Sequence, residues 1–188
     1  MRKAVFLDRD GVLNQDFPPH YPHRLDQMIM IPGVDDAIKL LKDNDYFLAI
    51  ISNQSGVARG YYEEKQISVF NDALLKEIRK KGGDIDAIYY CPHHPDAVIE
   101  KYKINCSCRK PKPGMILEAA KTFDIDLTSS FFVGDKATDV ETGRKAGVRS
   151  ILVLSGQGID EVSKVKPGDC LIAEDLYEAV TKYIATRI

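Results

Sequence analysis

The sequence is short of three features, and each shortage excludes a class of protein. No apolar run approaches the roughly 20 residues that a membrane-spanning helix needs, so we expect no membrane partner. A formal net charge of -2 provides no overall attraction for nucleic acid or for an anionic lipid surface. The N-terminus has two basic residues but continues into a short strand pattern and the polar "DRDG" rather than a signal peptide, so we expect a cytoplasmic protein.

Internal repeats, low-complexity tracts and an interdomain linker are absent as well. With 188 residues, of which 44% are hydrophobic and 29% charged, the chain has the composition of an ordinary globular protein with a substantial core. We expect one domain over residues 1–188 and, because its elements need no partner to complete them, a monomer.

What the sequence does contain is an alternation of short apolar runs with segments of helical periodicity. The i, i+3, i+4, i+7 spacing predicts one helix face at residues 34–41, and similar faces at 67–78, 115–123 and 176–184. The apolar runs predict strands at Ala4–Leu7, Tyr46–Ile51, Ala87–Tyr90, Phe131–Val133, Ser150–Leu154 and Cys170–Ala173. The alternation predicts an α/β fold, a doubly wound, Rossmann-like parallel sheet with helices on both faces.

Polar clusters follow three of these predicted strands. "DRDG" follows the first strand, "SNQSG" the second and "GDKATD" the fourth. In doubly wound sheets, ligands bind beyond the carboxyl ends of the strands where the strand order reverses, which for the common order 3-2-1-4-5-6 lies between the first and fourth strands. We therefore expect the three segments to meet in one crevice.

The carboxylates of these clusters favour a metal and phosphate site. Asp8 and Asp10 stand one residue apart, where two carboxylates repel each other, so we expect a functional site with a cationic or phosphorylated group beside them. Asp8 and Asp135, with a backbone carbonyl near Asp10, are the oxygen ligands that Mg²⁺ prefers. An aspartate can also form an aspartyl-phosphate, with a second carboxyl as general acid and base.

Other residues supply the donors that phosphoryl transfer needs. Ser52 carries a hydroxyl, the following "NQSG" offers backbone N–H groups in a turn, and Lys110 brings a point charge. An aspartate after a strand is commonly a turn or cap residue, and two of them are weak evidence alone. Three polar segments placed after the first, second and fourth strands are much harder to obtain by chance, which favours the functional interpretation.

Cysteine is scarce, and three of the four cysteines lie between residues 91 and 108. Cys91-x-His93 and Cys106-x-Cys108 match the ligand set of a tetrahedral structural zinc site. His94 competes with His93 for the fourth position, and spacing does not choose between them. Free buried thiols and a disulfide are the alternatives, and a cytosolic setting disfavours the disulfide.

The segment Pro95–Asn105 between the two halves of this set is expected to be a long irregular loop that the zinc ion fastens. A zinc ion with four protein ligands has no open position for water, so we expect it to have a structural role and not to take part in phosphate hydrolysis. Cys170 lies in an apolar run and is expected to be a core thiol.

The segments "FLDRDGVLN", "ISNQSG", "CRKPKPG" and "FFVGDKATD" resemble the four motifs of the haloacid dehalogenase-like phosphatase superfamily. The resemblance implies Asp8 as nucleophile, Asp10 as general acid and base, and Ser52 and Lys110 as phosphoryl stabilisers. It also implies Mg²⁺ on Asp8, on Asp10 through its carbonyl, and on Asp135. Asp139 is either an orienting residue for the metal shell or a surface or capping aspartate.

Within that superfamily, "CPHHP" followed by "CSCRKP" resembles the group that removes the 7-phosphate of D-glycero-D-manno-heptose 1,7-bisphosphate. This resemblance implies zinc on Cys91, His93, Cys106 and Cys108, in a loop insertion at about residues 91–108. The segments between the strands are too short for a large cap domain, so this loop would be the main substrate wall. The implied substrate contacts come from Asp16, Tyr21, Asn53, Gln54, Ser55, Arg109 and Lys136.

The expected substrate is thus a small phosphorylated sugar, since the neighbouring cations Arg109 and Lys110 suit a sugar with two phosphates. Histidinol phosphate is the alternative substrate, although the ligand loop here is longer than in that related group. A DNA 3′-phosphatase is disfavoured because neither a basic surface nor an aromatic stacking platform is evident. A non-catalytic phosphosugar-binding module would be expected to lack Asp8 or Asp10, and both are present.

Overall fold

The computed structural model describes residues 1–18 and 21–185. The described residues form a six-stranded parallel sheet in the order β3-β2-β1-β4-β5-β6. This confirms the predicted strand order and places β1 and β4 side by side at the reversal. The strands are β1 (Ala4–Leu7), β2 (Phe47–Asn53), β3 (Ala87–Cys91), β4 (Phe131–Gly134), β5 (Arg149–Val153) and β6 (Leu171–Ala173).

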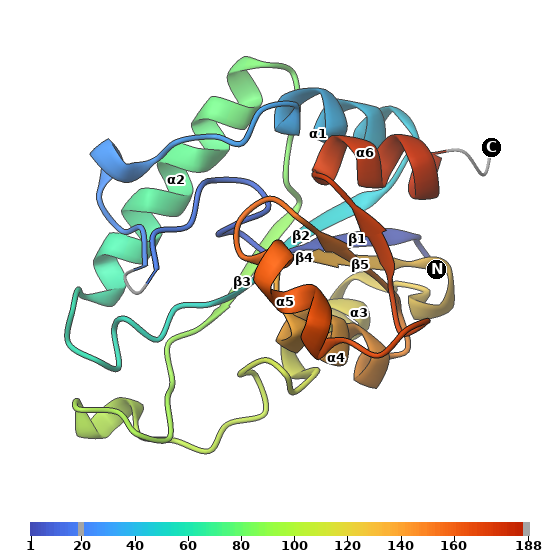
Figure 1. Cartoon of the computed structure of the whole chain (residues 1–188). Coiled ribbons are helices and arrows are strands. Elements are labelled where there is room, and N and C mark those ends of the chain that lie inside the picture. The colour runs from blue at the N-terminus through green and yellow to red at the C-terminus, as the bar shows by residue number, and fades with distance from the viewer. Residues whose placement is uncertain (19–20, 186–188) are drawn as a thin grey trace.

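Helices cover both faces of the sheet (Figure 1). The helices are α1 (Val34–Asp43), α2 (Glu64–Lys80), α3 (Gly114–Phe123), α4 (Ala137–Ala146), α5 (Gly158–Glu161) and α6 (Leu176–Ala179), which continues as a π-helical turn over Val180–Ile184. One-turn 3₁₀ helices lie at Leu25–Gln27, Glu100–Tyr102, Leu127–Ser129 and Val162–Lys164. Within the described ranges, no helix has both the length and the apolar character needed to cross a membrane.

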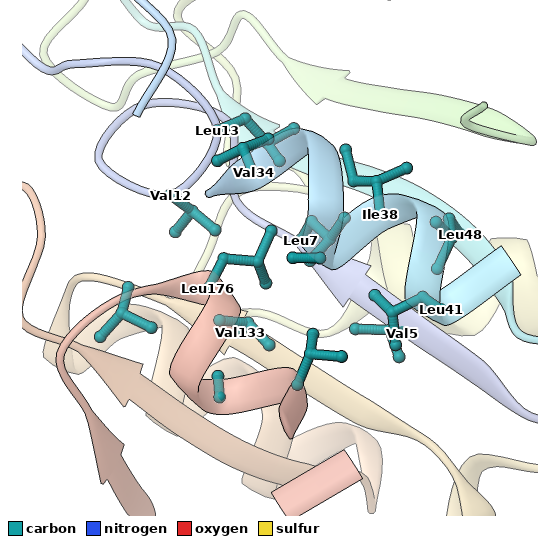
Figure 2. Packing of buried hydrophobic residues seen from close by; sticks show 14 of the residues in the cluster. Val5, Leu7, Val12, Leu13, Val34, Ile38, Leu41, Leu48, Val133 and Leu176 are labelled. Carbon is teal, nitrogen blue, oxygen red and sulfur yellow. The ribbon is translucent and has the colours of Figure 1, made fainter. Parts of the chain in front are cut away.

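The two faces of the sheet bury separate apolar clusters because side chains alternate along each strand. Val5 and Leu7 point toward α1, α2 and α6, where they pack in the larger cluster shown in Figure 2. Ala4 and Phe6 point to the opposite face and pack against α3 and α4. The four predicted helix faces supply most of the helical residues in these clusters, which confirms them as core.

Helix α4 was not predicted, and its packing explains why. Its buried face consists of Asp139, Val140, Thr142, Gly143 and Ala146, without a stripe of large apolar residues. A Cβ atom on Gly143 would lie 2.2 Å from the hydroxyl oxygen of Ser150 on β5. The helix therefore approaches the sheet too closely for large side chains, and periodicity of large apolar residues does not reveal it.

Two expectations about cysteine-bearing segments need correction. Cys170 is only partly buried and lies just before β6, which begins at Leu171. Leu171 and Ile172 are 39% and 43% exposed, because β6 is an edge strand. The loop after β3 is also not wholly irregular. Its 3₁₀ turn buries Tyr102, which joins Ala97, Val57 and other residues in a third small apolar cluster.

Candidate active site

A cavity of about 220 Å³ opens at the carboxyl ends of the central strands. Its walls come from the loops after β1, β2 and β4 and from the segment before α3, which the topology brings to one edge of the sheet. Its lining residues are Asp8, Asp10, Tyr21, Ser52, Asn53, Arg109, Lys110, Lys136, Thr138 and Asp139.

Asp8 extends β1, and its backbone N–H donates to the carbonyl of Val133 on β4 at 2.9 Å. Its carboxylate accepts from the N–H of Arg9 at 2.8 Å and lies 2.9 Å from Nζ of Lys110. Burial raises the pKa of Asp8 to about 6, against the lowering effect of the Lys110 charge. Asp8 is therefore a buried carboxylate with one cation at contact distance.

Asp135 at the end of β4 is fully buried, and burial raises its pKa to about 8. Its Oδ2 accepts from the backbone N–H of Gln157 at 2.9 Å, whereas Oδ1 has no hydrogen-bond partner among the described residues. Carboxylate oxygens of Asp8, Asp135 and Asp139 lie within 4.8 Å of one another. Nζ of Lys136 lies 3.7 Å from this Oδ1, beyond hydrogen-bond distance. A buried carboxylate oxygen that accepts no hydrogen bond, in a set of acidic ligands, fits a hard divalent cation such as Mg²⁺.

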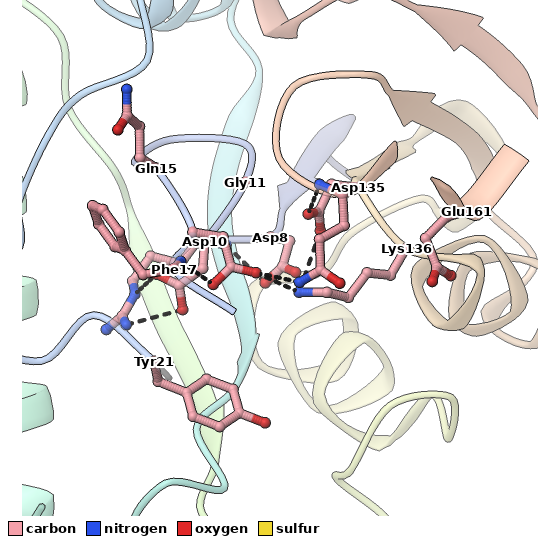
Figure 3. Close-up of polar contacts among 12 residues, drawn as sticks. Asp8, Asp10, Gly11, Gln15, Phe17, Tyr21, Asp135, Lys136 and Glu161 are labelled. Atoms are coloured by element: carbon pink, nitrogen blue, oxygen red, sulfur yellow. Dashed lines mark hydrogen bonds and ion pairs between the residues drawn. The ribbon is translucent and has the colours of Figure 1, made fainter. Parts of the chain in front are cut away.

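Two glycines make room for Asp135. Gly11 has a φ of +88°, and a Cβ atom there would lie 2.1 Å from Oδ2 of Asp135. Gly156, with a φ of +71°, approaches the same oxygen from the loop after β5. In Figure 3, Asp8 lies between Asp10 and Asp135, and the turn at Gly11 runs beside them. The glycine of "DRDG" thus permits both the turn and the close approach.

Lys110 connects Asp8 to Asp139. Its Nζ lies 2.7 Å from Oδ1 of Asp139 and donates to the carbonyl of Ile51 at 3.0 Å. Burial opposes the charged form, but Asp139 and Asp8 together raise the pKa of Lys110 above its usual value. Asp139 also accepts from the N–H of Lys136 at the start of α4. Asp139 therefore caps α4 and pairs with Lys110, and it is buried rather than on the surface.

The four "SNQS" residues, 52–55, divide into two that line the cavity and two that are buried next to it. Ser52 and Asn53 line the cavity, and Asn53 exchanges two hydrogen bonds with the backbone of Lys110, at 3.1 and 3.2 Å. Gln54 and Ser55 are fully buried. The side-chain amide of Gln54 donates to Asp10 and to Ser52, and the hydroxyl of Ser55 lies 2.9 Å from that of Tyr21.

The remaining predicted contacts lie at the rim. Nζ of Lys136 is 3.1 Å from Oδ2 of Asp16, and Gln157 donates to the same oxygen at 2.6 Å. Asp16 therefore contacts Lys136, which lines the cavity, but is not itself one of the lining residues given above. Nη1 of Arg109 donates to the carbonyl of His93 at 3.1 Å, which connects the loop after β3 to the cavity. Gln157 was not predicted, because it lies in no motif.

A second cluster contains Cys91, His93, Cys106 and Cys108, whose possible ligand atoms all lie within 4.8 Å of one another. Sγ of Cys91 is 3.5 Å from Sγ of Cys106, 3.1 Å from Sγ of Cys108 and 3.6 Å from Nδ1 of His93. Ligands around one tetrahedral Zn²⁺ at bond lengths of about 2.3 Å lie under ~4 Å apart, so the four residues fit that ion.

His94 is engaged elsewhere, which separates it from His93. Its Nδ1 accepts from the backbone N–H of Asp96 at 3.0 Å, and its Nε2 lies 3.3 Å from Nη2 of Arg59. All four cysteines, including Cys170, are free thiols. The geometry therefore favours His93 as the fourth member of the cluster.

Three comparisons with known proteins agree with this geometry. The family model described as HAD-hydrolase-like matches residues 107–179. A D-glycero-beta-D-manno-heptose-1,7-bisphosphate 7-phosphatase of Pasteurella multocida is 45% identical over 165 residues, 87% of this chain and 88% of that protein. One of Photorhabdus laumondii is 44% identical over 158 residues, 84% of this chain and 83% of that protein.

The fold of this chain is also similar to that of a solved phosphatase structure. The crystal structure of a D,D-heptose 1,7-bisphosphate phosphatase from B. bronchiseptica, complexed with magnesium and phosphate, superposes with a TM-score of 0.87. The two chains are 34% identical, with 96% of this chain and 97% of that chain covered. The chain therefore belongs to the D-glycero-D-manno-heptose-1,7-bisphosphate 7-phosphatase family of the haloacid dehalogenase-like hydrolases.

Proposed function

We propose that this protein is a Mg²⁺-dependent phosphomonoesterase that hydrolyses the 7-phosphate of D-glycero-D-manno-heptose 1,7-bisphosphate. The observation that carries the proposal is the buried Asp8 carboxylate, which lies in the cavity 2.9 Å from Nζ of Lys110. A carboxylate at this position can attack phosphorus, and the adjacent ammonium can neutralise the phosphoryl oxygens. The names of the family members support the heptose substrate.

In the proposed reaction, an oxygen of Asp8 forms a bond to phosphorus while the bond from phosphorus to the sugar oxygen breaks. The carboxyl group of Asp10 gives its proton to the departing oxygen and later takes one from the water that hydrolyses the aspartyl-phosphate. Ser52, Lys110 and the N–H groups of the "NQS" turn would hold the phosphoryl oxygens. The proposed contacts to the rest of the substrate are four residues that line the cavity, Arg109, Lys136, Asn53 and Tyr21. Three further proposed contacts, Asp16, Gln54 and Ser55, lie outside this lining.

Mg²⁺ would be held by Asp8, Asp135 and the backbone carbonyl of Asp10, and it would reduce the repulsion between Asp8 and the incoming phosphate. The Oδ1 of Asp135, which accepts no hydrogen bond, and the magnesium named for the B. bronchiseptica neighbour support this assignment. Zn²⁺ would be held by Cys91, His93, Cys106 and Cys108. Four protein ligands fill a tetrahedral zinc ion, so its role would be to shape the loop that carries Arg109.

We also propose that the chain works as one domain, as a monomer and in the cytoplasm, without a nucleic-acid partner. The two apolar clusters share one continuous sheet, which supports a single domain. Free thiols gathered as metal ligands support a reducing compartment, because an oxidising one would favour disulfides between them.

The test is phosphate release from heptose 1,7-bisphosphate, as separate α and β anomers, compared with histidinol phosphate. We expect a higher kcat/KM for a heptose bisphosphate and a product that keeps its 1-phosphate, identified by ³¹P NMR. A preference for histidinol phosphate would overturn the substrate assignment. Absence of phosphate release from every phosphomonoester, with Mg²⁺ present, would overturn the enzymatic proposal.

A further inference from the structure

The carboxylate of Asp10 accepts four hydrogen bonds. Arg9 donates Nε to Oδ1 and Nη2 to Oδ2, both at 3.0 Å, so its guanidinium grips both oxygens. Nδ2 of Asn14 donates to Oδ1 at 2.9 Å, and Nε2 of Gln54 donates to Oδ2 at 2.8 Å. Each carboxylate oxygen has two lone pairs, so these donors occupy all four.

Arg9 is itself held on three sides. Nη1 donates to Oδ1 of Asn71 on α2 at 3.0 Å, and Nη2 donates to the carbonyl of Pro22 at 2.9 Å. The guanidinium carbon lies 4.5 Å from the ring centroid of Phe70. Arg9 is 1% exposed and is among the largest fully buried side chains described. An arginine fixed in this way can hold the plane of a carboxylate, which a flexible surface arginine cannot.

A carboxyl group that transfers protons must keep its orientation while its charge changes. With four donors in place, Asp10 can take a proton only if one donor gives way. Asn14 and Gln54 each contribute one amide hydrogen bond to a single oxygen, whereas the two Arg9 bonds act as a fork. The fork can therefore hold the carboxyl plane toward the cavity when an amide contact opens.

We propose that Arg9 is a positioning residue that keeps Asp10 aligned for proton transfer to the leaving oxygen. The inference rests on the proposed function, because it takes Asp10 as the general acid and base. Arg9 lies outside the lining of the catalytic cavity described above, so its effect is exerted through Asp10. A purely structural ion pair would instead affect every substrate equally, and this difference makes the two roles separable.

The experiment compares Arg9→Lys with the wild-type protein on two substrates. Heptose 1,7-bisphosphate releases a sugar alkoxide, which needs a proton, whereas p-nitrophenyl phosphate releases a phenolate that leaves without one. Lysine keeps the charge but cannot form the fork. Since general acid catalysis contributes about 10²–10⁴-fold, we expect kcat/KM to fall ~30-fold or more on the bisphosphate and less than ~3-fold on the aryl phosphate. Arg144→Lys, at an exposed position on α4, is the matched control and should change neither value.

An equal loss on both substrates, or no loss on either, would overturn the inference. Zinc content and thermal unfolding report whether Arg9→Lys has folded. If it has not, Asn71→Leu removes the acceptor of Nη1 without touching Asp10, and we expect a selective loss on the bisphosphate of ~5-fold. A non-selective result for that variant would overturn the inference equally.

Failure of the proposed function is distinguishable from failure of this inference. Wild-type activity on heptose 1,7-bisphosphate tests the substrate alone, whereas the ratio between alkyl and aryl phosphates tests Arg9. If the wild-type protein does not hydrolyse the bisphosphate, any alkyl phosphate that it does hydrolyse takes its place in the ratio.

Discussion

Nζ of Lys110 lies 2.9 Å from Oδ1 of Asp8, although the two residues come from the segment before α3 and from the end of β1. The same nitrogen lies 2.7 Å from Asp139, so one buried cation faces two buried carboxylates. A third buried carboxylate, Asp135, completes a set with an excess of negative charge. Such a set is suited to bind a divalent cation, and the predictions below follow from it.

Asp8→Asn should abolish turnover, because an amide cannot attack phosphorus as a carboxylate does. Asparagine preserves the size of the side chain, so we expect zinc content and the thermal unfolding midpoint to stay close to wild type. Phosphate release, metal analysis and calorimetry check these three quantities. Asp43→Asn, at the exposed end of α1, is the matched control and should retain full activity. Residual turnover above a few per cent in Asp8→Asn would contradict the role of Asp8.

EDTA should inhibit reversibly, and Mg²⁺ should restore the rate. The reason is that the acidic set around Asp135 offers hard oxygen ligands, whereas the cluster of Cys91, His93, Cys106 and Cys108 offers thiolates. Activity after brief chelation and re-addition of each metal checks this. Recovery with Zn²⁺ alone would contradict the division between the two sites.

The affinity for Mg²⁺ should rise with pH between about 6 and 8. Burial raises the pKa of Asp135 to about 8 and that of Asp8 to about 6, so these carboxyls are increasingly protonated as pH falls through those values. Mg²⁺ must displace the protons, and one proton released per ion makes the affinity change by up to about tenfold per pH unit. Titration calorimetry at several pH values checks this, and an affinity that does not change with pH would contradict it.

The same raised pKa values set the stability of the metal-free protein. The folded form binds these protons more tightly than the unfolded chain, whose aspartates titrate near 3.8. The metal-free protein should therefore lose stability as pH rises from about 4 to 8, while the increase in unfolding midpoint caused by Mg²⁺ should grow. Asp135→Asn should reduce both trends.

His93→Ala should lower bound zinc from one equivalent to well below one, whereas His94→Ala should retain it. Nδ1 of His93 lies 3.6 Å from Sγ of Cys91 and 3.5 Å from Sγ of Cys108, whereas His94 bonds to the backbone of Asp96. The two adjacent substitutions are matched controls for each other. Metal analysis after dialysis reads out the difference, and zinc loss from the His94 variant alone would reverse the assignment.

Gly11→Ala should lose Mg²⁺-dependent activity. Its Cβ atom would lie 2.1 Å from Oδ2 of Asp135, and the φ of +88° is unfavourable for alanine. Gly82→Ala is the control for backbone strain alone, because its φ is +86° and no described atom lies within 4 Å of the added Cβ. We expect both variants to be destabilised, by about 1 kcal/mol for the control, and only Gly11→Ala to lose Mg²⁺ binding. Equal Mg²⁺ affinity in the two variants would contradict the argument.

The sheet could be predicted from the sequence because its strands are continuous apolar runs and parallel connections follow strict rules. The run Ala4–Leu7 is fully buried, and the order of all six strands agrees with the prediction. Helix α4 was missed because close packing at Gly143 selects small and polar residues. The exposure of Leu171 was missed because an apolar run does not report whether its strand lies at an edge.

The site could be predicted in part, since carboxylates after β1 and β4 must converge if those strands are neighbours. What the sequence does not contain is the direction of each side chain. Arg9 bonds both to Asp10 and to Asn71 on α2, so it connects the end of β1 to that helix. The spacing of residues along the sequence does not predict a contact between those two segments. The contact of Gln157 with Asp135 likewise depends on how the loop after β5 folds back.

The adjacency of β1 and β4 has a consequence for when activity arises during synthesis. Asp8 leaves the ribosome early, but β4, which ends next to Asp135, emerges only after the whole loop that follows β3 and after α3. A nascent chain that ends at β3 therefore has the proposed nucleophile without Asp135, the proposed metal ligand, so we expect hydrolysis to begin as a late event of folding. The time course of phosphatase activity during refolding should therefore report when the central strands have paired.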